Sequence, residues 1–371
     1  MISRRSVLFS PLALAACRRE RGSGFAGYAF VANEGGQAIA AVDLTAFAVI
    51  RHIPVDGSPT AVVTDPVRPA LYALTPENGT IHEISTRSRL EVRRRLRIGS
   101  SGLSMRISGD GKSLYVLCRA PRQLVRVDLE SFRIGGRVAL PAEPFDFDLA
   151  PNGTTAAVSL GASRSLVLAD SKTGAAHAIP YRGEAGIVRF QSDGRAVIVA
   201  NTSERMLSVY DVSRRRVVAH LPVAVRPDNH CFKPDGGQLF VTGEGMDAVV
   251  VVYPYRTPQV AETVLAGRGP GAMAASEGDP GYLFVANPAS GDVTILNIRT
   301  RRAIAAASVG ASPGYIAITP DNQYALVLNR QSGDMAVLLI TPRLGNRQKA
   351  AALFTMIPVG SNPVSAVVQK A

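Results

Sequence analysis

The polar residues with the most potential for chemistry lie in four short segments that recur about every 43 residues. The segments read Ser104-Met-Arg106, Asp146-Phe-Asp148, Ile187-Val-Arg189 and Asp228-Asn-His-Cys231. Because side chains alternate along a strand, the two carboxylates of the second segment are expected on one face. The candidate ligand-binding residues are therefore Arg106, Asp146, Asp148, Arg189, Asn229 and His230.

Two arginines beside two carboxylates allow two interpretations. Buried charge is costly unless it is paired or wet. The four side chains therefore either form a ladder of ion pairs that only closes the fold, or line a pocket whose edge attracts anions. Paired carboxylates can also bind Ca²⁺ or act as acid and base. Neighbouring arginines favour ion pairing instead, so no metal site is predicted.

The four segments belong to a repeat that runs from Tyr28 almost to the end of the chain. An apolar strand, such as Tyr28 to Asn33 or Tyr282 to Asn287, is followed by a second strand, a polar hairpin and a third strand. A Gly/Pro turn then leads to a fourth strand, which usually ends in turn residues such as Pro234-Asp-Gly236. Short β-rich runs with closely spaced turn signals predict an all-β fold. The asparagines that end equivalent strands are expected to satisfy turn backbone: Asn33, Asn201, Asn287 and Asn329.

The Tyr-x-Phe-Val-Ala-Asn strand and the downstream Val-Gly-x-x-Pro turn resemble the YVTN family of β-propeller repeats. The resemblance covers nearly all of residues 28 to 369, and at the level of fold it extends to lactonase-type and cytochrome d1-type propellers. It implies blades of four antiparallel strands around a central axis. Eight first strands favour eight blades, with seven as the alternative because the unit at 323 to 369 is irregular. The strand from Val364 to Val368 is expected to complete the blade that Tyr28 begins.

Two further patterns point to catalysis or a cofactor, and both have a structural explanation. The segment Gly310-Ala-Ser-Pro-Gly314 matches the G-x-S-x-G nucleophile motif. The same place in the repeat reads Gly360-Ser-Asn-Pro363, however, so we interpret it as a turn. The resemblance to d1-type propellers makes a haem ligand conceivable at His230, but a packed core histidine is favoured. No cofactor is therefore predicted.

The N-terminal segment resembles the signal peptide of a bacterial lipoprotein. Two basic residues precede a short apolar run that ends in Leu14-Ala-Ala-Cys17. We expect residues 1–16 to be removed, Cys17 to be lipidated, residues 17–27 to form a tether and residues 28–371 to form one propeller domain. Ser3 to Leu8 also resembles a twin-arginine signal, so the export route stays open. The expected location is the cell envelope, on the periplasmic or outer-surface side.

Arginines are concentrated in three hairpins that precede third strands: Arg87, Arg89, Arg93, Arg94, Arg95 and Arg97 in one, Arg214, Arg215 and Arg216 in the next, and Arg299, Arg301 and Arg302 in the last. The formal net charge of +12 favours anionic partners. The expected topology places these hairpins on the face at which the chain enters, so they either meet an anionic membrane or are solvated turns. No aromatic residues accompany the arginines, so nucleic acid is not an expected partner.

Cys118 and Cys231 lie in different repeat units and are expected to be buried free thiols. Together these features predict an exported, lipid-anchored monomer that serves as a scaffold for a small ligand or an envelope protein. The alternative is a lactonase-like hydrolase with a site at the mouth of the channel. No motif identifies that chemistry, and the fold alone does not imply it.

Overall fold

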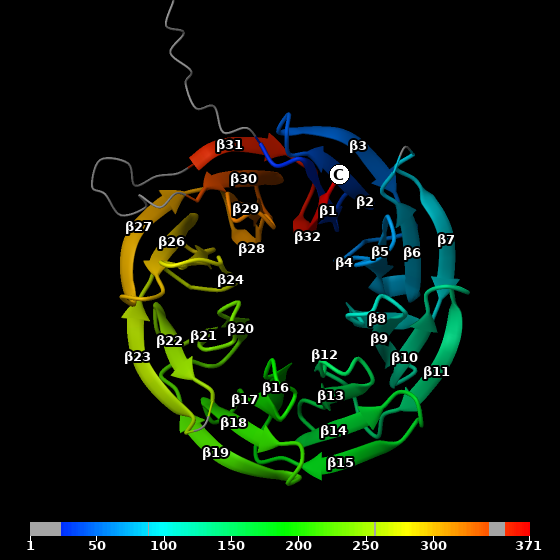
Figure 1. Ribbon diagram of the computed structural model, residues 1–371, viewed down its shortest axis with the longest axis vertical. Helices are drawn as coiled ribbons and strands as arrows, with labels where there is room; N and C mark the ends of the chain where they lie inside the picture. Colours follow the sequence, from blue (N-terminus) through cyan, green and yellow to red (C-terminus); the bar gives the residue numbers. More distant parts are fainter. Residues whose placement is uncertain (1–23, 88, 256, 341–352) are drawn as a thin grey trace, which may run out of the picture.

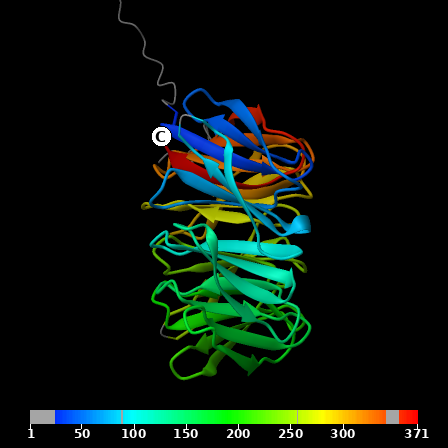
Figure 2. The same cartoon turned by 90° about the vertical axis from the view of Figure 1, so that its right-hand side faces the viewer.

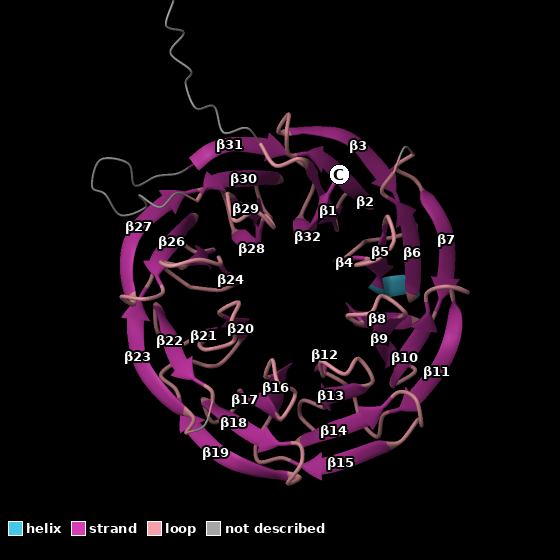
Figure 3. Cartoon of the chain, viewed as in Figure 1, coloured by secondary structure: helices cyan, strands magenta, loops and turns pink. Residues whose placement is uncertain are grey.

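The computed structural model describes residues 24–87, 89–255, 257–340 and 353–371. Eight four-stranded antiparallel sheets form a closed ring (Figure 1). This confirms the all-β fold with eight blades, and the seven-blade alternative is wrong. Figure 3 shows strands throughout, and the described residues contain one short helix, η1 (Pro76–Asn78). Within these ranges no helix has the length and apolarity needed to cross a membrane. The predicted signal peptide and Cys17 lie outside the described residues.

The four strands of each blade run in order from the central axis to the rim of the ring. Blade 1 contains β32 (Pro363–Lys370), β1 (Gly27–Asn33), β2 (Ala38–Asp43) and β3 (Ala48–Pro54). Blade 2 contains β4 (Ala61–Thr64), β5 (Ala70–Thr75), β6 (Thr80–Ser85) and β7 (Val92–Arg97). Blade 3 contains β8 (Ser101–Ile107), β9 (Ser113–Ala120), β10 (Gln123–Asp128) and β11 (Arg133–Ala139). Blade 4 contains β12 (Asp146–Leu149), β13 (Thr155–Ser159), β14 (Ser165–Asp170) and β15 (Ala176–Pro180).

The remaining four blades follow the same order. Blade 5 contains β16 (Ala185–Phe190), β17 (Ala196–Asn201), β18 (Met206–Asp211) and β19 (Arg216–Pro222). Blade 6 contains β20 (Asn229–Phe232), β21 (Leu239–Thr242), β22 (Ala248–Tyr253) and β23 (Gln259–Leu265). Blade 7 contains β24 (Met273–Ala275), β25 (Tyr282–Asn287), β26 (Asp292–Asn297) and β27 (Arg302–Ser308). Blade 8 contains β28 (Pro313–Ile318), β29 (Tyr324–Asn329), β30 (Asp334–Leu339) and β31 (Leu353–Pro358).

The C-terminal strand closes the ring, as the sequence predicted. β32 is the innermost strand of blade 1 and pairs antiparallel with β1, with Phe30 opposite Val367 and Ala32 opposite Ser365. Figure 1 shows β32 beside β1 although the two strands come from opposite ends of the chain. The pairing leaves β1 without an open edge, which is the usual way in which a propeller avoids unpaired strands.

The ring has two faces, seen edge-on in Figure 2. We call the first the entry face. Counting the strands of a blade from the axis outward, this face carries the turns between the first and second strands and between the third and fourth strands. The chain enters there, because Phe25 N–H donates to Leu44 O at 3.2 Å and Leu44 N–H donates to Gly27 O at 3.1 Å. The opposite face, which we call the far face, carries the other turns and the connections between blades. The three arginine-rich hairpins precede outer strands, so the topology places them on the entry face.

Eight clusters of buried hydrophobic side chains hold the ring together, and each lies at the junction of two neighbouring blades. Blade 1 packs on blade 8 through Val31, Tyr324 and Val359, for example. Phe25 is buried in the same cluster, so the domain begins to pack before residue 28, within the segment predicted as tether. Every blade thus depends on both neighbours for its core.

The paired Asn and Gly signals of the repeat contact one another on the far face. The side-chain amide of Asn33 donates to Val359 O at 2.7 Å, and that of Asn329 donates to Val309 O at 2.7 Å. Gly310 has φ 141°, and a Cβ atom there would lie 2.6 Å from Asn329 Nδ2. Asn201 bonds Arg182 O, and Asn287 bonds two side chains of its own blade. These contacts confirm the structural role of the asparagines and the interpretation of Gly310 to Gly314 as a turn.

Candidate functional site

The structure brings the four charged candidate residues together on three neighbouring inner strands. Arg106 lies on β8, Asp146 and Asp148 lie on β12, and Arg189 lies on β16. These strands belong to blades 3, 4 and 5 and follow one another around the central axis (Figure 1). The shared position in the repeat thus predicted spatial proximity correctly.

Asp146 is paired on several sides. Its Oδ2 atom accepts from Arg189 Nη1 at 2.6 Å and from the backbone N–H of Val188 at 3.2 Å. Arg106 Nη2 lies 4.0 Å from its other oxygen. The Asp146 side chain is 13% exposed and that of Arg189 is 25% exposed. Charge-assisted contacts at this burial hold the two blades in register.

Asp148, two residues further along β12, also contacts β16 and Arg106. Its Oδ2 atom accepts from the backbone N–H of Phe190 at 2.8 Å, and Arg106 Nε lies 3.9 Å from its Oδ1. Burial raises the pKa of Asp148, although Arg189 partly opposes this shift. Burial, aided by the charge of Arg189, lowers the pKa of Arg106, whose guanidinium also lies 5.7 Å from the ring centre of Phe147.

Similar polar contacts join inner strands at other blade junctions. The Tyr315 hydroxyl donates to Ala366 O at 3.0 Å between blades 8 and 1. Ser365 Oγ accepts from Val62 N–H at 3.4 Å between blades 1 and 2. The charged cluster is thus one instance of a general device in which inner-strand side chains reach a neighbouring blade. Of the two interpretations of the cluster, the geometry favours the ladder that closes the ring.

Asn229 and His230 lie on β20, one blade beyond Arg189 and outside this ion-pair network. Neither ring nitrogen of His230 has a hydrogen-bond partner in the described residues, and both are buried. Burial, followed by the charge of Arg189, lowers the pKa of His230 to about 3. The folded protein therefore keeps this imidazole neutral well into the acidic range.

Acidification is expected to destabilise the protein through His230. An unfolded histidine titrates near 6.5, so below that pH the unfolded state binds one more proton than the folded state. Stability should fall as the pH falls from 6.5 towards 3, by about 1.4 kcal/mol per pH unit from this one residue. Relative to His230→Phe, the wild-type protein should lose roughly 2 kcal/mol more between pH 7 and pH 5 in urea unfolding. The control His177→Phe, at an exposed position of β15, should keep the wild-type slope. Equal slopes for His230→Phe and wild type would contradict the assignment.

The two cysteines in the described residues, Cys118 and Cys231, are free and belong to different blades, as predicted. Cys118 lies buried on β9, and Cys231 lies partly buried on β20. Burial raises the pKa of both thiols to about 12, so neither is a reactive thiolate at neutral pH. In the described ranges no three His, Cys, Asp or Glu side chains come together in a way that could hold a metal ion.

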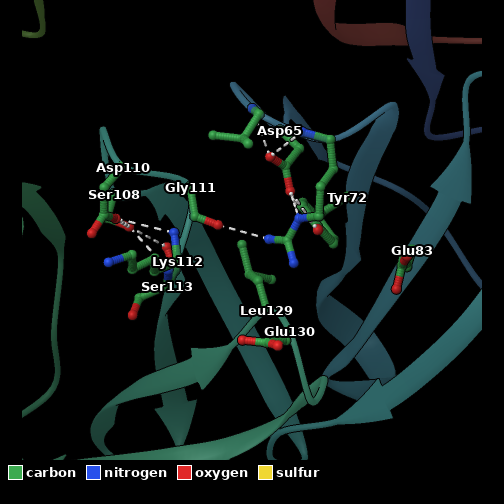
Figure 4. Close-up of polar contacts among 12 residues, drawn as sticks. Asp65, Tyr72, Glu83, Ser108, Asp110, Gly111, Lys112, Ser113, Leu129 and Glu130 are labelled. Atoms are coloured by element: carbon green, nitrogen blue, oxygen red, sulfur yellow. Dashed lines mark hydrogen bonds and ion pairs between the residues drawn. The ribbon is translucent and has the colours of Figure 1, made fainter.

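A second polar cluster, on the entry face between blades 2 and 3, was not predicted from the sequence (Figure 4). Asp65 accepts from Arg68 Nε at 2.8 Å and from the Tyr72 hydroxyl at 2.9 Å, and Arg68 Nη2 donates to Gly111 O at 2.7 Å. Burial would raise the pKa of Asp65, but hydrogen bonds from the Arg68 and Val67 N–H groups outweigh it and lower the pKa. In the sequence Asp65-Pro66 resembles an ordinary turn, and no residue pattern indicates that Arg68 contacts the next blade.

Several arginines of the arginine-rich hairpins are already paired with carboxylates. Arg94 bonds Glu83 and its guanidinium lies 4.6 Å from the ring centre of Phe132. Further pairs join Arg95 to Asp56, Arg214 to Asp211, Arg299 to Asp279 and Arg301 to Glu262. Only part of the arginine-rich surface is therefore available to an anionic partner.

No model of a protein family matches the sequence, and no curated protein matches it either. Among solved structures, dihydro-heme d1 dehydrogenase NirN in complex with DHE is similar with a TM-score of 0.78 and 16% identity, over 96% of this chain and 78% of NirN. The Swd1 β-propeller domain of Myceliophteria thermophila has a TM-score of 0.63 and 14% identity, over 77% and 98% of the two chains. Hydrazine synthase of Kuenenia stuttgartiensis has a TM-score of 0.57 and 19% identity, over 72% and 91%. At this level of identity the likeness is one of fold, so the chain shares the β-propeller architecture of these proteins.

Proposed function

We propose that this protein is an exported, lipid-anchored β-propeller of the cell envelope that binds a protein partner through its far face. Three large apolar side chains are exposed on that face: Phe145 (52%), Met246 (43%) and Leu265 (71%). Aromatic residues and methionine are enriched in the cores of protein interfaces. These exposed side chains are the observation that carries the proposal.

The predicted anchor agrees with this choice of face. Cys17 precedes Phe25 by eight residues (25 − 17), which span at most about 28 Å when extended. Because Phe25 lies at the entry face, a lipid on Cys17 would attach the domain on that side and leave the far face accessible to a partner. The repeat pattern supports a YVTN-type propeller, which here would serve as a rigid frame for the binding surface.

The charged cluster gives the hydrolase alternative little support. A general base must have a free lone pair within reach of its substrate. Asp146 instead accepts from Arg189 and from Val188 N–H, Asp148 accepts from Phe190 N–H, and Arg106 lies within 4.0 Å of both carboxylates. The lactonase-like alternative therefore loses its most plausible acid and base.

The far-face variant Phe145→Ser/Met246→Ser is expected to lose its partner. Full-length tagged protein would be crosslinked in envelopes, and the captured proteins quantified by mass spectrometry. Loss of two apolar anchors should reduce capture about tenfold, which corresponds to roughly 1.4 kcal/mol. Val67→Ser removes a side chain that is 72% exposed on the entry face and should capture as much as the wild type. A far-face variant that captures the same proteins in wild-type amounts would refute the proposed surface.

A further inference from the structure

We propose that the rim of the ring at blades 8 and 1 inserts into the lipid bilayer through an apolar patch formed by Ile50, Leu353, Phe354 and Met356. The inference rests on the Cys17 anchor of the proposed function. It adds the surface of the folded domain that meets the lipid, and so fixes how the ring is oriented on the membrane.

The patch joins the outermost strands of two neighbouring blades. Ile50 (49% exposed) lies on β3, and Leu353 (39%), Phe354 (42%) and Met356 (42%) lie on β31. The two strands contact each other and meet end to end at the edge of the ring (Figure 1). Of the nine large hydrophobic side chains exposed in the described residues, these four lie on two outer strands that contact each other, and the other five are distributed over blades 2 to 6 and their connections.

The repeat itself does not require apolar residues at these positions. Seven of the eight outer strands have a β-bulge at the same place, and Ile50 and Phe354 occupy it in blades 1 and 8. The same position holds Arg93 in blade 2, Gly135 in blade 3, Val218 in blade 5, Ala261 in blade 6 and Ile304 in blade 7, and of these only Val218 is an exposed large hydrophobic side chain. A bulge leaves its extra residue unpaired and bends the strand. The clustered apolar surface is thus a property of blades 8 and 1 and not of the fold.

The patch contacts the turn that holds the entering chain. The rings of Phe47 and Phe354 pack at a tilt with their centres 4.9 Å apart, and Phe47 ends the turn whose Leu44 contacts the entering chain through its N–H and O. Thr45 Oγ1 also donates to Phe25 O at 3.3 Å. A lipid on Cys17 would therefore keep this part of the rim, rather than any other, within about 28 Å of the bilayer.

The surrounding charge fits a bilayer with anionic headgroups. Arg51 is exposed next to Ile50, and Lys370 is exposed where β32 ends beside Gly27. Basic residues close to an anionic surface strengthen binding, and apolar side chains beside them can enter the acyl boundary.

The absence of tryptophan from the sequence allows a direct test. Full-length lipidated protein carrying Phe354→Trp would be reconstituted into vesicles of phosphatidylethanolamine and phosphatidylglycerol. We expect its emission to shift to the blue relative to the same folded protein without vesicles, and to be quenched by acyl-brominated lipid. The matched control is Val218→Trp, at the bulge position of blade 5 across the ring, where the exposed side chain should be neither shifted by vesicles nor quenched.

The outcomes separate the patch from the anchor. Mass spectrometry of the Cys17 peptide reports lipidation independently. If Cys17 is lipidated and Phe354→Trp is quenched no more than Val218→Trp, the patch does not touch lipid and the inference is overturned, while the anchor stands. If Cys17 carries no lipid but Phe354→Trp is still quenched, the patch is supported and the anchor fails. A blue shift that depends on protein concentration without vesicles would assign the patch to a second copy of the chain and overturn the membrane assignment.

Discussion

Deleting residues 362 to 371 is expected to abolish cooperative folding of the ring. The deletion removes β32 and leaves the edge of β1 unpaired along seven residues. It also removes Ala366 from the core between blades 8 and 1, together with its bond to Tyr315 and the contact of Ser365 with Val62. Domains are stable by only about 5–15 kcal/mol, and the loss of an entire inner strand is of that order.

Circular dichroism melting of the full chain and of the truncated chain measures this effect. The truncated protein should show no sharp transition and should aggregate through the open β1 edge. A chain that lacks only Ala371, which is exposed beyond the end of β32, is the matched control and should melt like the wild type. A sharp wild-type transition in the truncated protein would mean that seven blades and an open sheet suffice for stability.

The closure was predictable because each blade carries its own local signals. A Pro-Asp-Gly turn or a strand ending in Asn can be recognised within a few residues, and eight such units favoured eight blades over the seven-blade alternative. The partner of the last strand follows from the topology alone, because a chain that starts on a second strand must end on an inner one. Phe25 lies outside the predicted domain because it precedes the first complete repeat, and only the packing of blade 8 buries it.

The site was predictable in its members but not in its bonds. Arg106, Asp148 and Arg189 share one repeat position, which predicts that they meet. That Asp146 accepts from Val188 N–H depends on how blade 5 is rotated against blade 4, and backbone donors leave no mark in a sequence. The Asp65 cluster and the bulge at Phe354 could not be predicted for the same reason, because both depend on contacts or register shifts between strands.

The ladder interpretation predicts that the two carboxylates of β12 respond differently to substitution. Asp146→Asn removes the charge that lies 2.6 Å from Arg189 and leaves that guanidinium without a close anionic partner, although it still donates to Val188 O. Unpairing a buried ion costs about 3–5 kcal/mol, and the partial exposure of Arg189 reduces the expected loss to about 2 kcal/mol. Removing the unpaired cation as well, in Asp146→Asn/Arg189→Gln, should restore part of this loss, and urea unfolding at pH 7 measures both.

Asp148→Asn is the matched control on the same strand, and it should cost less than about 1 kcal/mol, because an amide oxygen can still accept from Phe190 N–H. Burial raises the pKa of Asp148, so ionisation of this carboxyl opposes folding. Its contribution to stability is complete below the unfolded value near 3.9 and declines as the pH rises through the higher folded value. The free energy of unfolding of Asp148→Asn, relative to that of the wild type, should therefore be higher at pH 7 than at pH 4.

Equal losses of stability for Asp146→Asn and Asp148→Asn at pH 7 would show that the carboxylates are not paired as the structure places them, and would reopen the channel as a site for a ligand.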